Sequence, residues 1–237
     1  MKTRTKQTLS TKLTRLLFIS LMAYGCEEGT MLEGPCSLNI NDDLAEYQRQ
    51  LDSGEISADT PKPKACATFV EDPDANLSIN IKMRDFNNTQ KEKMLEAVEK
   101  IKIVINSTEF KDRVLNHTYD QKKTYVDNNS LSNQEVYQKI MDGKEDLIPE
   151  LDNEMDIDVT MYYKRSSTVG YTYPDTVRTW VNSRFFNGYT HGQVAANVVH
   201  EWTHKIGFDH AYRNNSSRPY SVPYAIGSII EELVDSM

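Results

Sequence analysis

Four residues between positions 200 and 210 have the types and spacing of a metal site. His200 and His204 are four residues apart, and His210 follows six residues later. On an α-helix, a spacing of four places two imidazoles one turn apart, where both reach one zinc ion at about 2.0–2.1 Å. Glu201 lies about 100° round the helix from His200, where a carboxylate reaches a water on the metal rather than the metal itself. The pattern predicts three histidine ligands to Zn²⁺ and a general base.

A helix must hold the first two of these ligands. Thr190 and Gln193 form a capping-box pattern, which predicts a helix from about His191 to Lys205 or Ile206. The helical period separates a polar face from an apolar face. The polar face carries Gln193, Asn197, His200 and His204, and the apolar face carries Ala195, Val198, Val199, Trp202 and Ile206.

Gly207 is expected to end this helix. Glycine adopts the left-handed backbone conformation that stops a helix and turns the chain back. That turn lets His210 approach as the third ligand and leaves a fourth position on the metal for water.

The whole segment, HEWTHKIGFDH, fits the pattern H-E-x-x-H-x-x-G-x-x-H at every specified position and resembles the metzincin clan of zinc peptidases. The resemblance implies a zinc-dependent endopeptidase in which Glu201 is the general base. It also implies a substrate that lies extended along an edge strand, for which Val169 to Tyr173 is the candidate. The expected partner is a protein or peptide substrate.

One feature of the metzincin pattern is missing. Metzincins carry a methionine turn beneath the zinc, but this chain has no methionine between His210 and Met237. The counterpart is the segment from residue 221 to 224, where Pro223 is expected to supply the turn and an apolar floor. Tyr224, in preference to Tyr220, is the candidate for a zinc ligand or an oxyanion donor. The alternative for either tyrosine is packing under the site.

Two other interpretations remain open. Glu231 and Asp235 form an E-x-x-x-D pattern that resembles thermolysin-like enzymes and makes Glu231 a rival third ligand. The functional alternative is a zinc-containing surface binding protein or pseudoenzyme without peptidase activity. His117, His191 and Asp209 are expected to pack or to form local hydrogen bonds rather than bind metal.

The remaining periodicities predict an α+β domain over residues 77–237. Strand patterns cover residues 77–83, 124–126, 155–163, 169–173 and 177–186, and helix patterns cover 88–105, 132–141 and the C-terminal segment. The order is similar to that of a small metzincin domain: a mixed twisted sheet, a long backing helix, an active-site helix and a C-terminal helix.

The N-terminal segment has the layout of an export signal. Residues 1–25 contain five basic residues, no acidic one and a short apolar run, so they are excluded from the predicted fold. The segment that ends at Cys26 resembles a bacterial lipobox, which implies membrane attachment through lipid on Cys26. Ordinary secretion is the alternative. Residues 26–76 are interpreted as a tether or loosely structured extension.

The net charge and the cysteines limit the possible partners and the cellular compartment of the protein. The chain has 27 basic and 35 acidic residues, and without the basic leader its formal charge is −13. Nucleic acid is therefore an unsuitable partner, and a monomer is expected. In an oxidising compartment Cys36 and Cys66 are expected to form a disulfide; the alternative is a cysteine that caps the zinc before activation.

Overall fold

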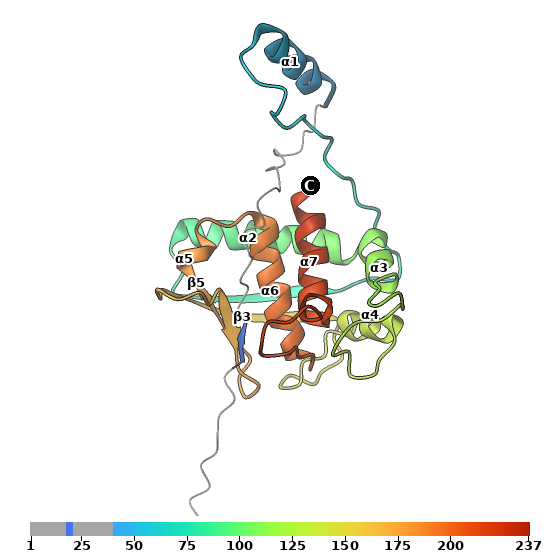
Figure 1. Ribbon diagram of the computed structural model, residues 1–237. Helices are drawn as coiled ribbons and strands as arrows, with labels where there is room; N and C mark the ends of the chain where they lie inside the picture. The colour runs from blue at the N-terminus through green and yellow to red at the C-terminus, as the bar shows by residue number, and fades with distance from the viewer. Residues whose placement is uncertain (1–17, 21–39) are drawn as a thin grey trace, which may run out of the picture.

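The computed structural model describes residues 18–20 and 40–237, which form the α+β architecture expected from the sequence (Figure 1). The described elements are β1 (Phe18–Ser20), α1 (Ile40–Ser53), β2 (Ser78–Arg84), α2 (Asn88–Ile105), α3 (Thr108–Leu115), α4 (Asn133–Met141), β3 (Glu154–Tyr162), β4 (Gly170–Thr172), β5 (Arg178–Asn182), α5 (Ser183–Phe186), α6 (His191–Lys205), the 3₁₀ helix η1 (Arg218–Tyr220) and α7 (Val222–Asp235).

The sheet is mixed, with the strand order β1-β4-β5-β3-β2. Strands β2, β3 and β5 are parallel, whereas β4 is antiparallel to β5 and β1 is antiparallel to β4. Along β3, Met155, Ile157 and Val159 are buried and alternate with less buried acidic residues. This period of two gives the sheet one apolar face, against which the helices pack.

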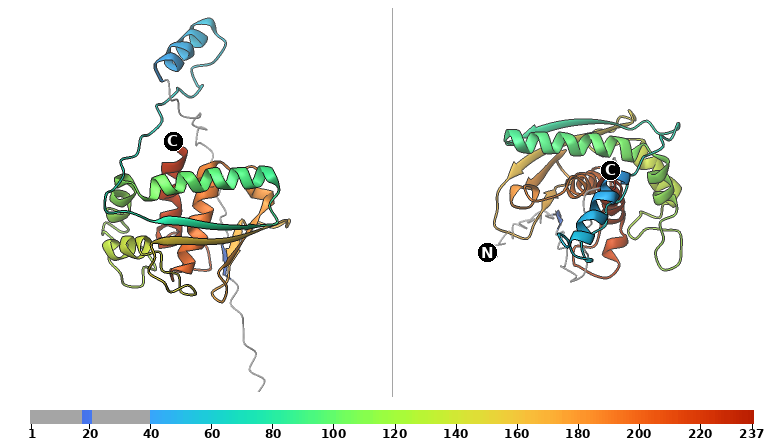
Figure 2. Two further views of the ribbon diagram at one scale, coloured as in Figure 1. Left: turned by 180° about the vertical axis from the view of Figure 1, so that it is seen from behind. Right: turned by 90° about the horizontal axis from the view of Figure 1, so that it is seen from above.

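Helix α2 is the long backing helix. Its N-cap, Asn87, forms a reciprocal capping box with Gln90, and its buried face includes Met94, Val98 and Ile101. Figure 2 shows α2 running alongside β2 and β3. The helical period of its apolar residues therefore matches the face that covers the sheet.

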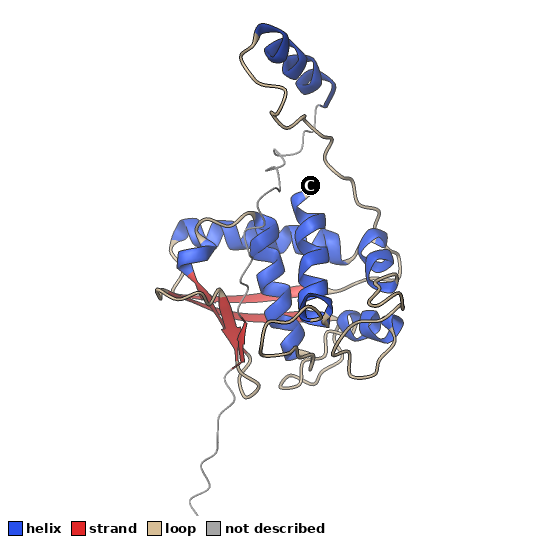
Figure 3. Ribbon diagram, in the orientation of Figure 1, coloured by secondary structure: helices blue, strands red, loops and turns tan. Residues whose placement is uncertain are grey.

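Helices α6 and α7 lie side by side in the middle of the domain, and Figure 3 shows both beside the strands. The two helices approach closely at Gly227 of α7, where an added Cβ would lie 3.2 Å from the Ala196 carbonyl oxygen and 3.6 Å from the His200 Cβ. Residues 194–203 of α6 are all buried, so its polar face is enclosed as well as its apolar face.

Three expectations differ from the structure. Residues 124–126 do not form a strand; Val126 makes a single bridge to Ser221. The segment 177–186 is a strand only to Asn182, whose side chain accepts a hydrogen bond from the Arg184 N–H and so begins α5. The extension contains α1, a helix that Figure 1 shows apart from the other described elements.

The leader and two of the cysteines lie largely outside the described residues. Cys26 and Cys36 fall in that part, as does the leader apart from residues 18–20, which pair with β4 although the leader was excluded from the predicted fold. Cys66 is disulfide-bonded. Among the described residues, no helix is long and apolar enough to cross a membrane.

Candidate metal centre

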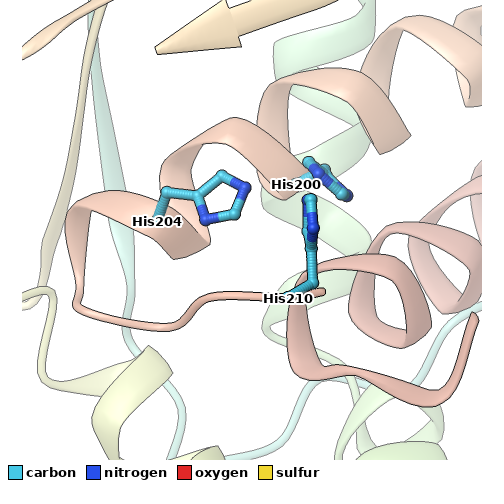
Figure 4. Close-up of side chains that lie close together, drawn as sticks. All are labelled: His200, His204 and His210. Carbon is cyan, nitrogen blue, oxygen red and sulfur yellow. The ribbon is translucent and has the colours of Figure 1, made fainter. Parts of the chain in front are cut away.

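Three histidine side chains converge at the C-terminal end of α6 (Figure 4). His200 and His204 project from successive turns, and His210 approaches from the segment that follows. One ligand atom from each ring lies within 4.8 Å of the others. Two ligands on one zinc lie at most about 4.2 Å apart, so small side-chain rotations bring all three to a common ion. The predicted triad is confirmed as a group that could hold a metal ion.

The turn between the second and third histidines has the predicted cause. Gly207 adopts a φ of +84°, in the left-handed region, immediately after α6 ends. The chain then reverses, so that the ring centroids of His204 and His210 lie 4.9 Å apart. A side chain at this position would be strained, which explains why the motif requires glycine there.

Hydrogen bonds orient two of the rings. The Nδ1 atom of His204 lies 2.7 Å from the Phe208 carbonyl oxygen and 3.6 Å from a carboxylate oxygen of Asp209. The Nδ1 atom of His210 lies 3.2 Å from the Ala211 carbonyl oxygen. In each case a proton on Nδ1 leaves Nε2 as the lone-pair donor toward the centre. The local role expected for Asp209 is thus observed.

The ring of His210 has a feature that suits a metal site. The Nε2 atom of His210 is buried and has no hydrogen-bond partner in the described part of the chain. A buried nitrogen without a partner is costly, and a metal ion would satisfy it. Neutral imidazole is a good ligand for zinc and for other first-row transition metals, so the donor set fits a divalent ion of this group.

Burial keeps these rings in the form that binds metal. The pKa of His200 lies well below its usual 6.5, first because the ring is buried and then because His204, His210 and Arg218 place positive charge nearby. Burial, with His204 and Arg218, lowers the pKa of His210 to about 4. Both rings are therefore neutral at neutral pH, as metal ligation requires.

Glu201 is enclosed beside the triad. Glu201 is 1% exposed. Its negative charge contributes to the raised pKa of Tyr162, and it also opposes the lowering of the pKa of Lys205. Helix α6 thus buries this acid one residue after His200, and its role as a general base stays a prediction. A buried carboxylate at such a position is suited to proton transfer.

Tyr224 of α7 packs directly on two of the candidate ligands. Its ring centroid lies 4.5 Å from that of His200 and 4.8 Å from that of His210. Tyr220, in contrast, packs on Tyr119 and is 41% exposed. The structure therefore brings Tyr224, and not Tyr220, to the centre.

Arg218 is a site residue that the sequence analysis missed. It is 4% exposed, and its Cζ lies 4.7 Å from the ring centroid of Tyr224. Its Nε and Nη2 atoms are buried without a hydrogen-bond partner among the described residues. The cation–π contact accounts for only part of the cost of burying this charge. No motif or period singles out Arg218, because its position depends on the packing of η1 against α7.

The segment beneath the centre differs from the expected turn. The 3₁₀ helix η1 supplies the turn, Ser221 precedes α7, and Pro223 lies in the first turn of that helix. Proline is favoured there because its fixed φ suits a helix and its missing N–H is not needed. Pro223 is buried and so contributes to an apolar floor, but it does not make the turn.

Several other candidates lie away from the triad. Glu231 does not belong to the group of convergent ligands; its charge acts instead on Tyr189. His117 stacks on Tyr125 with a centroid distance of 4.0 Å, and His191 pairs with Glu96 at 3.0 Å. These contacts agree with the structural roles expected for the two histidines.

The candidate substrate strand lies next to α6. In β4, an added Cβ at Gly170 would lie 3.0 Å from both amide atoms of Asn197, which is one turn before His200, and 3.2 Å from the Trp180 carbonyl oxygen. Close backbone approach therefore brings this strand against α6, the helix that carries His200 and His204. Its other edge is paired with β1, so β4 is an inner strand of the described sheet and the expectation of an edge strand at residues 169–173 is wrong there.

No protein-family model matches this sequence, and no curated protein matches it. The functional assignment therefore depends on the residues and their geometry.

Proposed function

We propose that the chain is a zinc-dependent endopeptidase of the metzincin type. The observation that carries the proposal is the buried Glu201 next to the first of three convergent histidines, of which burial keeps His200 and His210 neutral. Three protein ligands with a fourth position for water are typical of catalytic rather than structural zinc. A merely structural site would not need an acid beside the first ligand.

His200, His204 and His210 would hold the ion, and zinc, when bound, polarises a carbonyl group and makes a bound water more acidic. Glu201 accepts a proton from the attacking water and passes it to the leaving amine, so that no covalent enzyme intermediate is needed. Tyr224, which packs on His200 and His210, is the candidate donor to the developing oxyanion.

The variant Glu201→Gln tests this role. It keeps the size of the side chain and removes its capacity as a base, so we expect full zinc content and a fall in cleavage of unfolded casein of at least about 100-fold. Zinc is measured by elemental analysis and cleavage by the release of soluble peptides. Glu99→Gln, on the exposed surface of α2, is the matched control.

The outcomes separate the proposed function from its rival. Unchanged turnover in Glu201→Gln would exclude this residue as the base. A wild-type protein that contains one zinc per chain but cleaves nothing would favour a zinc-containing surface binding protein or pseudoenzyme. Loss of zinc together with activity in Glu201→Gln would show that the substitution acts through the metal site and not through proton transfer.

A further inference from the structure

A cavity of about 160 Å³ adjoins the metal centre at His204. Its walls come from four parts of the chain: the loop at residues 145–148, Asp156 of β3, residues 172–177 between β4 and β5, and residues 204–209 at the end of α6. A cavity of about 150 Å³ can hold a group as large as benzene. The space therefore suits one side chain.

The cavity is acidic. Four carboxyl groups line it, whereas the lining contains one ammonium group, that of Lys205. The acidic lining residues are Glu145, Asp146, Asp156 and Asp209. Such a surface attracts a cationic group of a bound molecule and repels a carboxylate of a bound molecule.

Lys205 does not offset this charge by pairing with the acids. Its Nζ donates hydrogen bonds to the carbonyl oxygens of Tyr173 at 3.1 Å, Thr176 at 2.5 Å and Arg178 at 3.4 Å. An ammonium group has three donors, so these contacts use all of them. Lys205 therefore fastens the β4–β5 connection to α6, and no N–H of this group remains for a bound molecule.

Glu145 is a buried carboxylate without a cationic partner in the described part of the chain. This residue is 3% exposed, and its Oε1 accepts hydrogen bonds from Trp202 Nε1 at 2.5 Å and from the Asp156 N–H at 3.0 Å. The carboxylate also accepts a hydrogen bond from the residue's own backbone N–H, so its neighbours in the described part of the chain are neutral donors, and no ion pair there involves Glu145. A buried carboxylate without a counter-ion is costly, and a cationic group in the cavity would relieve that cost.

Apolar groups complete the cavity. Leu147, Ile148, Pro174 and Val177 contribute to its lining. A lysine or arginine side chain combines an aliphatic stem with a charged end, and such side chains lay the stem along apolar surface. A shorter or neutral side chain would leave Glu145 unpaired.

We propose that this cavity is a specificity subsite that receives a lysine or arginine side chain of a peptide substrate, with Glu145 as the residue that pairs with the cation. The subsite rests on the proposed function because its position beside His204 places the bound side chain near the cleaved bond. Asp146, an exposed residue that also lines the cavity, adds to the preference through its charge.

The test uses the zinc-loaded protein and peptides in which each position in turn is lysine, methionine or glutamate. At one position of the peptide we expect kcat/KM to be at least about 10-fold higher for lysine than for methionine. This ratio is the effect expected of one charge-assisted hydrogen bond. In Glu145→Gln, whose amide oxygen can still accept both hydrogen bonds, the preference should fall below about threefold while the methionine peptide is still cleaved. Glu99→Gln, exposed on α2, is the matched control.

A binding measurement separates this inference from the proposed function. Agmatine, an alkyl guanidinium without a peptide bond, is titrated by calorimetry into wild type, Glu145→Gln and Asp146→Asn. Binding that is lost in the first variant and weakened in the second supports the subsite even if no peptide is cleaved. Because Asp146 is exposed, its variant keeps the test valid if Glu145→Gln fails to fold. Cleavage without a lysine preference, or agmatine binding that neither variant changes, would overturn the proposal.

Discussion

The three imidazoles differ in what holds each of them. His204 is oriented by the Phe208 carbonyl, His210 by the Ala211 carbonyl, and His200 by a hydrogen bond with the Pro223 backbone and by its burial against Tyr224. A ring that is fixed before the ion arrives loses little freedom on binding it. The donor set is therefore prepared by the fold, with one ligand from the segment beyond the helix.

Replacing His210 tests which third ligand completes the set. We expect His210→Ala to lose most of its zinc after dialysis, because two ligands from one helix remain, and Glu231→Gln to retain it, because Glu231 lies outside the triad. Elemental analysis of the two variants checks this. Full zinc retention in His210→Ala would refute the triad.

The lowered pKa values of His200 and His210 give the metal-free protein a defined acid response. The unfolded chain takes up protons near pH 6.5, whereas folded His210 does so near pH 4, so stability is highest above pH 6.5 and falls as the pH drops toward 4. For His210 the loss amounts to about 3 kcal/mol, and His200 adds to it. Urea unfolding between pH 7 and 4 measures the decline.

The asparagine variant His210→Asn is the control for this pH dependence. It removes one of the titrating rings, so its stability should decline less over the same interval. A wild-type unfolding free energy that stays constant from pH 7 to pH 4 would contradict the assignment of the lowered pKa values.

At the scale of elements, the N-terminal end of α6 is tied to α7. Its first turn is held by Thr190, whose Oγ1 accepts a hydrogen bond from the Gln193 N–H at 3.1 Å and donates to Asp235 of α7 at 3.1 Å. Asp235 also accepts a hydrogen bond from the Gly192 N–H. The last residue of α7 therefore caps the helix that carries two of the ligands.

Removing this cap should destabilise the whole domain, since α6 forms its centre. We expect Thr190→Ala to lower the free energy of unfolding by about 1 kcal/mol or more, as the loss of an N-cap does, and Thr190→Ser to lower it much less. Urea titrations of the two variants give the difference. Equal stability would mean that the hydroxyl of Thr190 does not support the helix.

The elements that the sequence predicted well are those with local signals. Capping boxes at Ser132 and Thr190 placed the starts of α4 and α6, and the left-handed Gly207 placed the turn before His210. The cavity at His204 could not be predicted in this way, because its walls meet only after four parts of the chain fold together. The same holds for Arg218, whose burial follows from the packing of η1 and α7.

The whole molecule is strongly acidic, with a formal charge of −8 for the full chain. A field of this sign speeds the encounter with basic peptides and slows the encounter with acidic ones. Its sign matches that of the acidic cavity beside His204, so under the proposed function long-range steering and local recognition would favour the same basic peptides.

Salt should therefore affect basic substrates selectively. Raising the ionic strength from 0.05 to 1 M shortens the screening length to about 3 Å, and we expect kcat/KM for a lysine-containing peptide to fall several-fold. The matched peptide with methionine should change little. Initial rates at four salt concentrations check this, and a parallel decline for both peptides would indicate a general effect of salt on the enzyme.

The close approach of β4 to α6 at Gly170 also has a consequence for how such a domain can vary. The spacing between strand and helix is set where no side chain exists, because any Cβ there would press on Asn197 and on the Trp180 carbonyl. Position 170 thus acts as a spacer. Alanine, serine and valine at this position would move the strand outward in graded steps, so the spacing between β4 and α6 could be tuned without altering Glu201 or a histidine of the triad.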